Sequence, residues 1–384
     1  RTCIKSFDIF RIIKMYNKII FFANDFGYGP TSNALSIARA LSRRGLQTVL
    51  VTAGENDLIA RASGINIEKV ASLRDVAVIT EYLKSHSDDQ SLVVSVMNRF
   101  AVTAANTTGR FCVLVDDLYW FWRDGGRPTE YEDANIQVCC VLPWQLDSVH
   151  STYTLRHTCV QPDISISQTH ERGNNWLYSF NGLRTPFYTE EHDVYVSFMG
   201  IIIKELARRQ SLVVVGPEYI RPTIEQFLPK NTLYMPLSKA KYLETLASVG
   251  GVYLNGGLNS FVEAVMSDTP IRMLLPSNQS QYGLLSEIAN EIDVLITDVC
   301  PLLSVIPNHQ DMLAFANERE AIDAWSKRLY EVLMTDNIEE TILRCMDGYN
   351  NSSEIDWGTY FTKWQNAVNN STSISDIVLD IIQN

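Results

Sequence analysis

The stretch GGVYLNGGLNSFVEAVMSDTPIRMLLPSNQSQ, residues 250–281, decides the fold. Its apolar runs at 252–254 and 271–275 have the length of buried strands, and apolar residues recur at helical spacing between them. The first run ends in the turn Asn255-Gly256-Gly257, and the second run ends in a proline and a polar loop. This is the pattern of a βαβ unit, whose polar groups gather at the carboxyl ends of parallel strands.

The polar residues of this unit suit a phosphorylated ligand. Two glycines at a helix start permit positive φ and close backbone approach, and the free N–H groups there favour an anion, although an ordinary tight turn also explains Gly-Gly. Glu263 lies early in the helix, where a carboxylate can bind vicinal ribose hydroxyls; a solvated helix face is the alternative. Gln279 and Gln281 follow the second strand, in either a sugar-binding loop or an ordinary polar one.

Length and composition favour a two-domain globular protein. The 384 residues exceed one compact core, and 46% hydrophobic with 20% charged residues is ordinary for a soluble chain. The net charge of −12 argues against a general nucleic-acid surface. Seven cysteines with no CxxC pair and no secretory signal indicate a reducing, cytoplasmic location.

The N-terminal stretch combines basic residues with an apolar run, as a signal peptide does. Lys14 and Lys18 interrupt that run and no small-residue cleavage site follows it, so residues 19–23 are better interpreted as a first core strand. We expect Met15 to be the natural start and residues 1–14 an extension. No apolar run reaches the roughly 18 residues that a membrane span needs.

Strand and helix patterns alternate along the rest of the chain, which predicts doubly wound parallel sheets. The polar segment 150–172 is interpreted as a passage between two halves. The expected domains are residues 15–170, residues 171–355, and a helical tail at 356–384, with packing of that tail on the first domain left open. Further strands are predicted at 18–23, 48–52, 92–97, 111–115, 136–142, 176–180, 212–215 and 232–235.

The pattern Gly-Gly-x-Asn-Ser-x-x-Glu-Ala, followed by Pro270, Leu275-Pro276 and a loop with glutamines, resembles the donor site of GT-B glycosyltransferases. The similar families are the UDP-N-acetylglucosamine transferases of peptidoglycan synthesis, the UDP-glycosyltransferases and the antibiotic glycosyltransferases. The resemblance implies two Rossmann-like domains with a cleft between them, and a nucleotide-diphosphate sugar, most simply UDP-linked. It assigns Gly256, Gly257, Asn259 and Ser260 to phosphate, Glu263 to ribose, Gln279 and Gln281 to the sugar, and Asn181 and Gly182 to a second approach to phosphate.

The acceptor side departs from the family. Many UDP-glycosyltransferases carry a histidine base after the first strand, and this chain has no histidine before His86. Asp25 is our first candidate for the base and Asp117, in the stretch FCVLVDDLYWFW, is the second; a turn or capping role explains either equally well. The candidate acceptor-binding residues, for which loop structure and core packing are the alternatives, are Gly27, Tyr28, Gly29, Tyr119 and Trp120.

The resemblance implies an inverting, metal-independent glycosyltransferase that acts on a nucleotide sugar and a small-molecule acceptor. The histidines have no HxH or HExxH spacing, so no metal site is expected, and no cofactor beyond the co-substrate is implied. The loops DFGYGP and VDDLYWFW also resemble those of enzymes that glycosylate a nucleobase. A GT-B sugar-nucleotide 2-epimerase and a non-catalytic sugar-nucleotide-binding protein are the alternatives, and the sequence leaves the sugar, the acceptor and the oligomer open.

Overall fold

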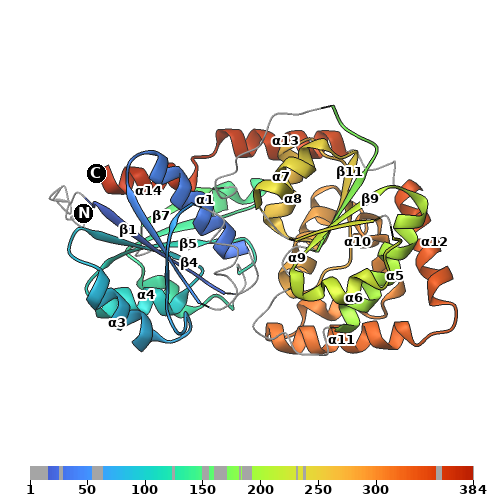
Figure 1. Cartoon of the computed structure of the whole chain (residues 1–384), viewed down its shortest axis with the longest axis horizontal. Coiled ribbons are helices and arrows are strands. Elements are labelled where there is room, and N and C mark those ends of the chain that lie inside the picture. Colours follow the sequence, from blue (N-terminus) through green and yellow to red (C-terminus); the bar gives the residue numbers. More distant parts are fainter. Residues whose placement is uncertain are drawn as a thin grey trace, which may run out of the picture.

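The computed structural model describes residues 16–25, 29–53, 64–122, 126–148, 155–159, 171–180, 183, 193–230, 232–236, 239–351 and 357–383. Within these ranges the chain forms two parallel β-sheets, each flanked by helices, which lie side by side (Figure 1). The expected N-terminal extension, residues 1–14, lies outside them. The predicted doubly wound architecture is confirmed.

The first sheet is parallel throughout the described strands, in the order β3-β2-β1-β4-β5-β6-β7. Its chain therefore starts in the middle of the sheet and winds outward in both directions, which leaves a topological switch point between β1 and β4. Its strands are β1 (Lys18–Ala23), β2 (Gln47–Thr52), β3 (Asn66–Lys69), β4 (Ser91–Val96), β5 (Phe111–Asp116), β6 (Ile136–Cys140) and β7 (Leu155–Cys159).

The side chains of β1 explain why this sheet is covered on both faces. Ile19 and Phe21 point into a core shared with α1 (Gly29–Arg43), while Ile20 and Phe22 point into a core shared with α3 (Val76–His86) and α4 (Arg99–Thr107). Each of these four side chains is fully buried. A continuous apolar run is what a strand buried on both faces requires.

The second sheet has the order β10-β9-β8-β11-β12, and its switch point lies between β8 and β11. Its described strands are again parallel. They are β8 (Trp176–Ser179), β9 (Leu212–Gly216), β10 (Leu233–Pro236), β11 (Gly251–Leu254) and β12 (Ile271–Met273). The helices of this half are α5 (Asp193–Arg209), α6 (Arg221–Glu225), α7 (Lys239–Ser248), α8 (Leu258–Met266), α9 (Gln279–Glu291) and α10 (Ile296–Val299).

The C-terminal helices pack on both domains. The helices α11 (Glu318–Leu333) and α12 (Ile338–Asn351) lie against α5 of the second domain. The helix α13 (Trp357–Asn370) contacts α8 and also η2 (Pro143–Ser148) of the first domain. The last helix, α14 (Ile374–Gln383), returns to α1, as its position beside the first sheet shows (Figure 1).

The structure corrects the predicted elements at three places. Two edge strands, β3 and β7, were not predicted, and β7 falls inside the segment interpreted as a polar passage. Both are short and carry polar residues, because an edge strand buries less of its surface. The helix α9 begins at Gln279, since the side chain of Asn278 accepts a hydrogen bond from the Gln281 N–H and caps it. Gln279 and Gln281 are therefore in a helix, not in a loop.

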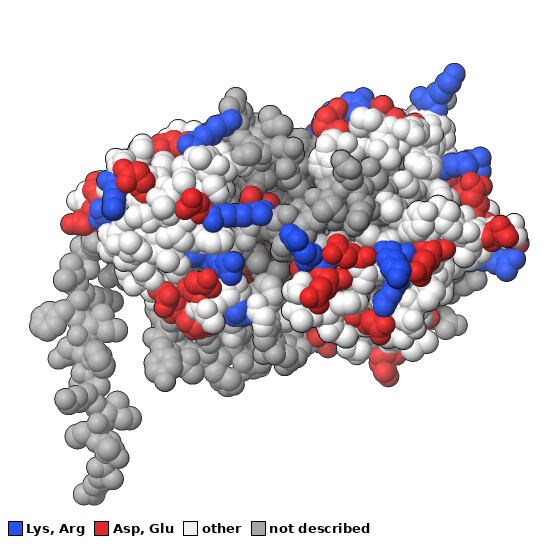
Figure 2. All heavy atoms as spheres, turned by 90° about the horizontal axis from the view of Figure 1, so that it is seen from below, with Lys and Arg blue, Asp and Glu red and all other residues white. Residues whose placement is uncertain are grey.

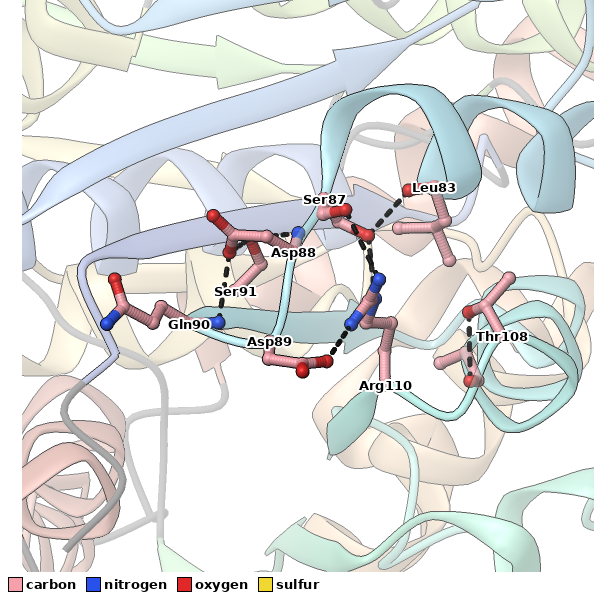
Figure 3. A network of polar contacts seen from close by, with 9 residues as sticks. Leu83, Ser87, Asp88, Asp89, Gln90, Ser91, Thr108 and Arg110 are labelled. Atoms are coloured by element: carbon pink, nitrogen blue, oxygen red, sulfur yellow. Dashed lines mark hydrogen bonds and ion pairs between the residues drawn. The ribbon is translucent and has the colours of Figure 1, made fainter.

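A polar network fixes the turn between α3 and β4 at the amino-terminal edge of the first sheet (Figure 3). The Asp88 carboxylate accepts hydrogen bonds from the Gln90 N–H at 3.0 Å and the Ser91 hydroxyl at 2.8 Å. The Arg110 guanidinium reaches the Ser87 hydroxyl at 2.9 Å and the Asp89 carboxylate at 2.7 Å. This end of the sheet is opposite to the carboxyl ends of the strands, so we assign the network to the fold and not to a ligand.

Charged side chains of both signs are mixed over the two domains on the face shown in Figure 2. The described part of this face has no continuous basic surface of the kind that binds nucleic acid. No helix in the described ranges is both long enough and apolar enough to cross a membrane.

Candidate active site

The switch point of the first sheet places Asp25 just after β1. Its side chain is 28% exposed, and its Oδ1 lies 2.8 Å from Nε of Arg74. The preceding residue, Asn24, donates its side-chain amide to the carbonyl of Met97 at the end of β4. Met97 has a φ of 55°, a left-handed conformation that is rare for such a side chain and common at functional sites. Asp25 is thus at the expected edge, but as a partner in an ion pair.

Asp117 follows β5 at the same edge and is in a very different environment. It is buried, and its Oδ2 accepts a hydrogen bond of 2.6 Å from the side-chain amide of Asn33. Burial raises the pKa of Asp117 to about 7, the Asn33 hydrogen bond opposes that rise, and the charge of Asp116 adds to it. A carboxyl group with a pKa near neutrality is suited to accept a proton at physiological pH.

Asp116, next to it, is held by Arg127. The Arg127 Nε lies 2.8 Å from the Asp116 Oδ2, and the carboxyl group is fully buried. Burial raises the pKa of Asp116, and the Arg127 charge lowers it. The ion pair with Arg127 holds Asp116 in place, and the Asp116 charge raises the pKa of Asp117.

The Gly-rich turn of the second domain presents the N-terminus of α8. Gly257 is the N-cap and has a φ of −82°, and neither glycine of the turn uses the positive φ that glycine permits. Gly256 is instead required by space, because an added Cβ would lie 2.5 Å from the carbonyl oxygen of Gln281. An added Cβ on Gly257 would meet nothing closer than 3.9 Å. The helix start is therefore open on the Gly257 side.

Two buried polar atoms mark the switch point of the second sheet. Ser179 ends β8 and Asn255 follows β11, and both side chains are fully buried. The Asn255 amide donates to the Tyr195 hydroxyl at 2.6 Å, which fixes its orientation; its Oδ1 and the Ser179 Oγ have no hydrogen-bond partner among the described residues. These two atoms differ from other unpartnered buried atoms of the described residues, such as the Trp325 Nε1, in lying at the switch point, where a ligand or a water molecule could satisfy them.

Asn259 joins the two domains. Its side-chain amide donates to the Oδ1 of Asn33 at 2.8 Å, and Asn33 in turn donates to Asp117. The start of α1 is also close, since a Cβ on Gly29 would lie 3.8 Å from the Asn259 Nδ2. A predicted phosphate residue and a predicted catalytic residue are thus connected through Asn33, which sequence reasoning missed. The available signal was a polar residue on the apolar stripe formed with Ile37 and Leu41.

Glu263 is buried in α8, so the solvated-face alternative is wrong. Its carboxylate forms an ion pair with Lys239, at the start of α7, which sequence reasoning also missed. The assignment of Glu263 to ribose stays a prediction. A ribose bound there would have to share the Glu263 carboxylate with the ammonium group of Lys239.

The two predicted sugar-binding glutamines hold loops of their own domain. The side-chain amide of Gln279 donates to the carbonyls of Met312 and Phe315 at 3.1 and 3.0 Å. The Gln281 Oε1 accepts hydrogen bonds from the backbone N–H and the hydroxyl of Ser277. These contacts give both residues a structural role, and sugar binding stays a prediction for them.

The aromatic cluster after Asp117 lies at the contact between the domains. Trp120 is buried in the core of the second domain, and Phe121 packs so closely on Gly283 of α9 that a Cβ there would lie 3.0 Å from its ring. Tyr119 lies beside the guanidinium of Arg127. Trp120 is thus packed in the core, and acceptor binding by Tyr119 and Trp120 stays a prediction. Gly27, Tyr28, Asn181 and Gly182 lie outside the described residues.

In the described part of the chain, no three His, Cys, Asp or Glu side chains are placed to hold a metal ion. Ser260, the remaining residue assigned to phosphate, is buried in the first turn of α8.

No protein-family model and no curated protein sequence matches this chain. Among solved structures it is similar to "Spinosyn Forosaminyltransferase SpnP", with 13% identity, 95% of this chain and 98% of that chain covered, and a TM-score of 0.55. UGT71G1 of Medicago truncatula complexed with UDP-glucose is less similar, with 11% identity, 97% of this chain and 99% of that chain covered, and a TM-score of 0.49. MurG of Acinetobacter baumannii has 12% identity, 96% of this chain and 99% of that chain covered, and a TM-score of 0.46. The geometry of the two sheets and the likeness to the first of these structures show that the chain has the GT-B fold.

Proposed function

We propose that this protein is a glycosyltransferase that moves a sugar from a nucleotide-diphosphate donor, most simply UDP-linked, to a hydroxyl, amine or similar group of a small acceptor. The observation that carries the proposal is the connection of Asp117 to the Gly-rich helix start of α8 through Asn33 and Asn259. A proton acceptor and an anion site are thereby held together across two domains. The structurally similar protein named above, a forosaminyltransferase, supports the same chemistry.

The donor diphosphate would bind at the N-terminus of α8. The open approach at Gly257 and the unpartnered Ser179 hydroxyl, one on each side of the switch point, support this placement. The partial positive charge of the helix start stabilises the charge that the diphosphate gains as it leaves. The unpartnered Asn255 Oδ1 is an acceptor and suits a hydroxyl or amide donor of the ligand, not a phosphate oxygen.

Asp117 would act as the general base. As the acceptor atom attacks the anomeric carbon, its proton passes to the Asp117 carboxylate, and the bond from that carbon to the diphosphate oxygen breaks. This single displacement inverts the configuration at the anomeric carbon. Asp117 must be ionised at the start, and a pKa of about 7 allows a substantial ionised fraction at neutral pH.

The test combines binding with turnover. Thermal unfolding in the presence of UDP, TDP and GDP and their sugars should show a rise in Tm with one nucleotide series, since a ligand of the native state stabilises it. An acceptor panel should then yield a glycosylated product. An isomerised sugar nucleotide formed without acceptor would show an epimerase, binding without turnover on any acceptor would favour a binding protein, and no binding in any series would overturn the proposal.

A further inference from the structure

Asn33 uses both ends of its side-chain amide at the contact between the domains. Its Nδ2 donates to the Asp117 Oδ2 at 2.6 Å, and its Oδ1 accepts from the Asn259 Nδ2 at 2.8 Å. Asn33 and Asp117 are both buried. Water therefore competes poorly with the hydrogen bond from Asn33 to Asp117, and a buried hydrogen bond to a carboxylate is among the stronger ones, whereas the bond from Asn259 is only partly buried.

The orientation of this amide depends on the second domain. An asparagine side chain can rotate so that its oxygen replaces its nitrogen, and an oxygen facing a carboxylate oxygen would be repulsive. The donation from Asn259 fixes the Asn33 oxygen on the side of α8, which leaves the Asn33 nitrogen facing Asp117. The second domain thus selects the orientation that stabilises the ionised carboxyl group.

The other groups around Asp117 do not replace this donor. Asp116 has the same charge and is paired with Arg127 at 2.8 Å. Cys140 of β6 offers a thiol to the Asp117 Oδ1 at 3.6 Å, which is a long contact from a weak donor, and its sulfur lies 3.3 Å from that of Cys159. Asn33 on α1 is the short, oriented donor among these contacts.

We propose that Asn33 is a positioning residue for Asp117, and that its contact with Asn259 couples the docking of the second domain to the charge state of this carboxyl group. The base is then fully prepared only when the two domains are in contact at α1 and α8. This inference rests on the proposed function for the role of Asp117 as a base, but the coupling itself is a property of the free protein.

The coupling can be measured without substrate. The side-chain carboxyl carbon of Asp117 is followed by NMR in aspartate-labelled protein, identified by its absence in Asp117→Asn, and titrated in the wild type and in variants. In Asn33→Ala we expect the Asp117 midpoint to rise by about one pH unit or more, because a hydrogen bond to the charged form is lost. Asn259→Ala should raise the Asp117 midpoint by a smaller amount. Asn33→Ser should give a midpoint between those of the wild type and Asn33→Ala, because its hydroxyl can still donate a hydrogen bond.

The double variant separates coupling from two independent effects. With Asn33 already removed, Asn259→Ala should add nothing, because its effect passes through Asn33. An unchanged midpoint in Asn33→Ala or in Asn259→Ala, or an additive double variant, would overturn the inference. If Asn33→Ala does not fold, Asn33→Ser and Asn259→Ala decide the question with the same titration.

Turnover gives an independent readout. The acidic limb of the kcat/KM profile should move to higher pH in Asn33→Ala, whereas a merely structural loss would lower the profile without moving it. If the NMR midpoints shift as expected but Asp117→Asn keeps full turnover, the coupling stands and the catalytic assignment fails. If Asp117→Asn abolishes turnover while the midpoints do not depend on Asn33, the function stands and the coupling fails.

Discussion

The Nε of Arg74 lies 2.8 Å from the Oδ1 of Asp25, so the first carboxylate at the edge of the first sheet is already neutralised by an ion pair. Asp117, at the same edge, forms no ion pair with a described residue and is buried beside a second carboxylate. The proposed function therefore takes Asp117, the second candidate from the sequence, as the base in place of Asp25, the first candidate.

Asp117→Asn should lower kcat by about 10² to 10⁴, the range typical for loss of a general base, with the donor Kd unchanged. Asp25→Asn should cost about tenfold or less, because it removes one partner of a half-exposed pair. Steady-state kinetics with donor binding by calorimetry measure both. A greater loss in Asp25→Asn than in Asp117→Asn would make Asp25 the base.

The free energy of unfolding should depend on pH because the pKa of Asp117 differs between the folded and unfolded states. This pKa is raised to about 7 in the folded state, from an ordinary value of 3.8 for an aspartate, so the native protein binds more protons than the unfolded chain between about pH 4 and pH 7. Stability from this group is therefore present at low pH and is lost as the pH rises toward 7. The cost of ionised Asp117 above that range is on the order of a few kcal/mol.

Asp117→Asn should remove this cost, since asparagine stays neutral and still accepts a hydrogen bond from Asn33. Its free energy of unfolding, relative to the wild type, should therefore be higher at pH 8 than at pH 4.5. Denaturant unfolding at both pH values measures the difference. A difference that does not change with pH would show that the native pKa of Asp117 is not raised.

The sequence predicts those parts of the fold that depend on local patterns. The runs at residues 19–23 of β1 and 252–254 of β11 are continuously apolar, as strands buried on both faces must be, and the Gly256-Gly257 turn lies where the pattern places it. The edge strands β3 and β7 were missed, because a polar strand at an edge has no such signal.

The site was harder to predict, because its contacts join residues far apart in the chain. Asn33 and Asn259 are separated by 226 positions, and no local pattern reports a hydrogen bond between them. The sequence likewise gives the identity of Glu263 but not its pairing with Lys239. The environment that shifts the Asp117 pKa is assembled from α1, β5 and β6, so it exists only in the folded protein.

Gly256 and Gly257 should respond differently to the same substitution. In Gly256→Ala the new methyl group would lie 2.5 Å from the backbone oxygen of Gln281, so α8 and α9 must move apart, and we expect a loss of about 1–3 kcal/mol in stability. Gly257→Ala meets nothing closer than 3.9 Å and should leave the Tm nearly unchanged. Its methyl group would still narrow the approach to the helix start.

Donor affinity provides the second readout of this pair. In Gly257→Ala we expect a higher Kd for the nucleotide sugar at unchanged stability, measured by calorimetry. An unchanged Kd would contradict the binding of the diphosphate at the start of α8. An unchanged Tm in Gly256→Ala would contradict the close contact with Gln281.

Glu263→Gln should weaken donor binding by about tenfold or more, which corresponds to roughly 1.4 kcal/mol, because a neutral amide accepts weaker hydrogen bonds from ribose hydroxyls. Lys239→Met is the matched control, since it removes the other half of the pair and keeps the carboxylate. Its effect should fall on stability, because it leaves the buried Glu263 charge without its partner. A donor Kd that is the same in Glu263→Gln and the wild type would rule out the ribose assignment.

The last helix should contribute to stability through its apolar face and not through its ion pair. Ile377 is 4% exposed in the core that α14 shares with α1, so Ile377→Ala should cost about 2–5 kcal/mol. Its neighbour Asp376 pairs with Arg44 at 2.6 Å, but the two side chains are 47% and 40% exposed, and a pair so accessible to water contributes at most about 1 kcal/mol. Denaturant unfolding of Ile377→Ala and Asp376→Asn compares the two directly. Equal losses would mean that the charge pair contributes as much as apolar packing to holding α14 on the first domain, which would contradict the prediction.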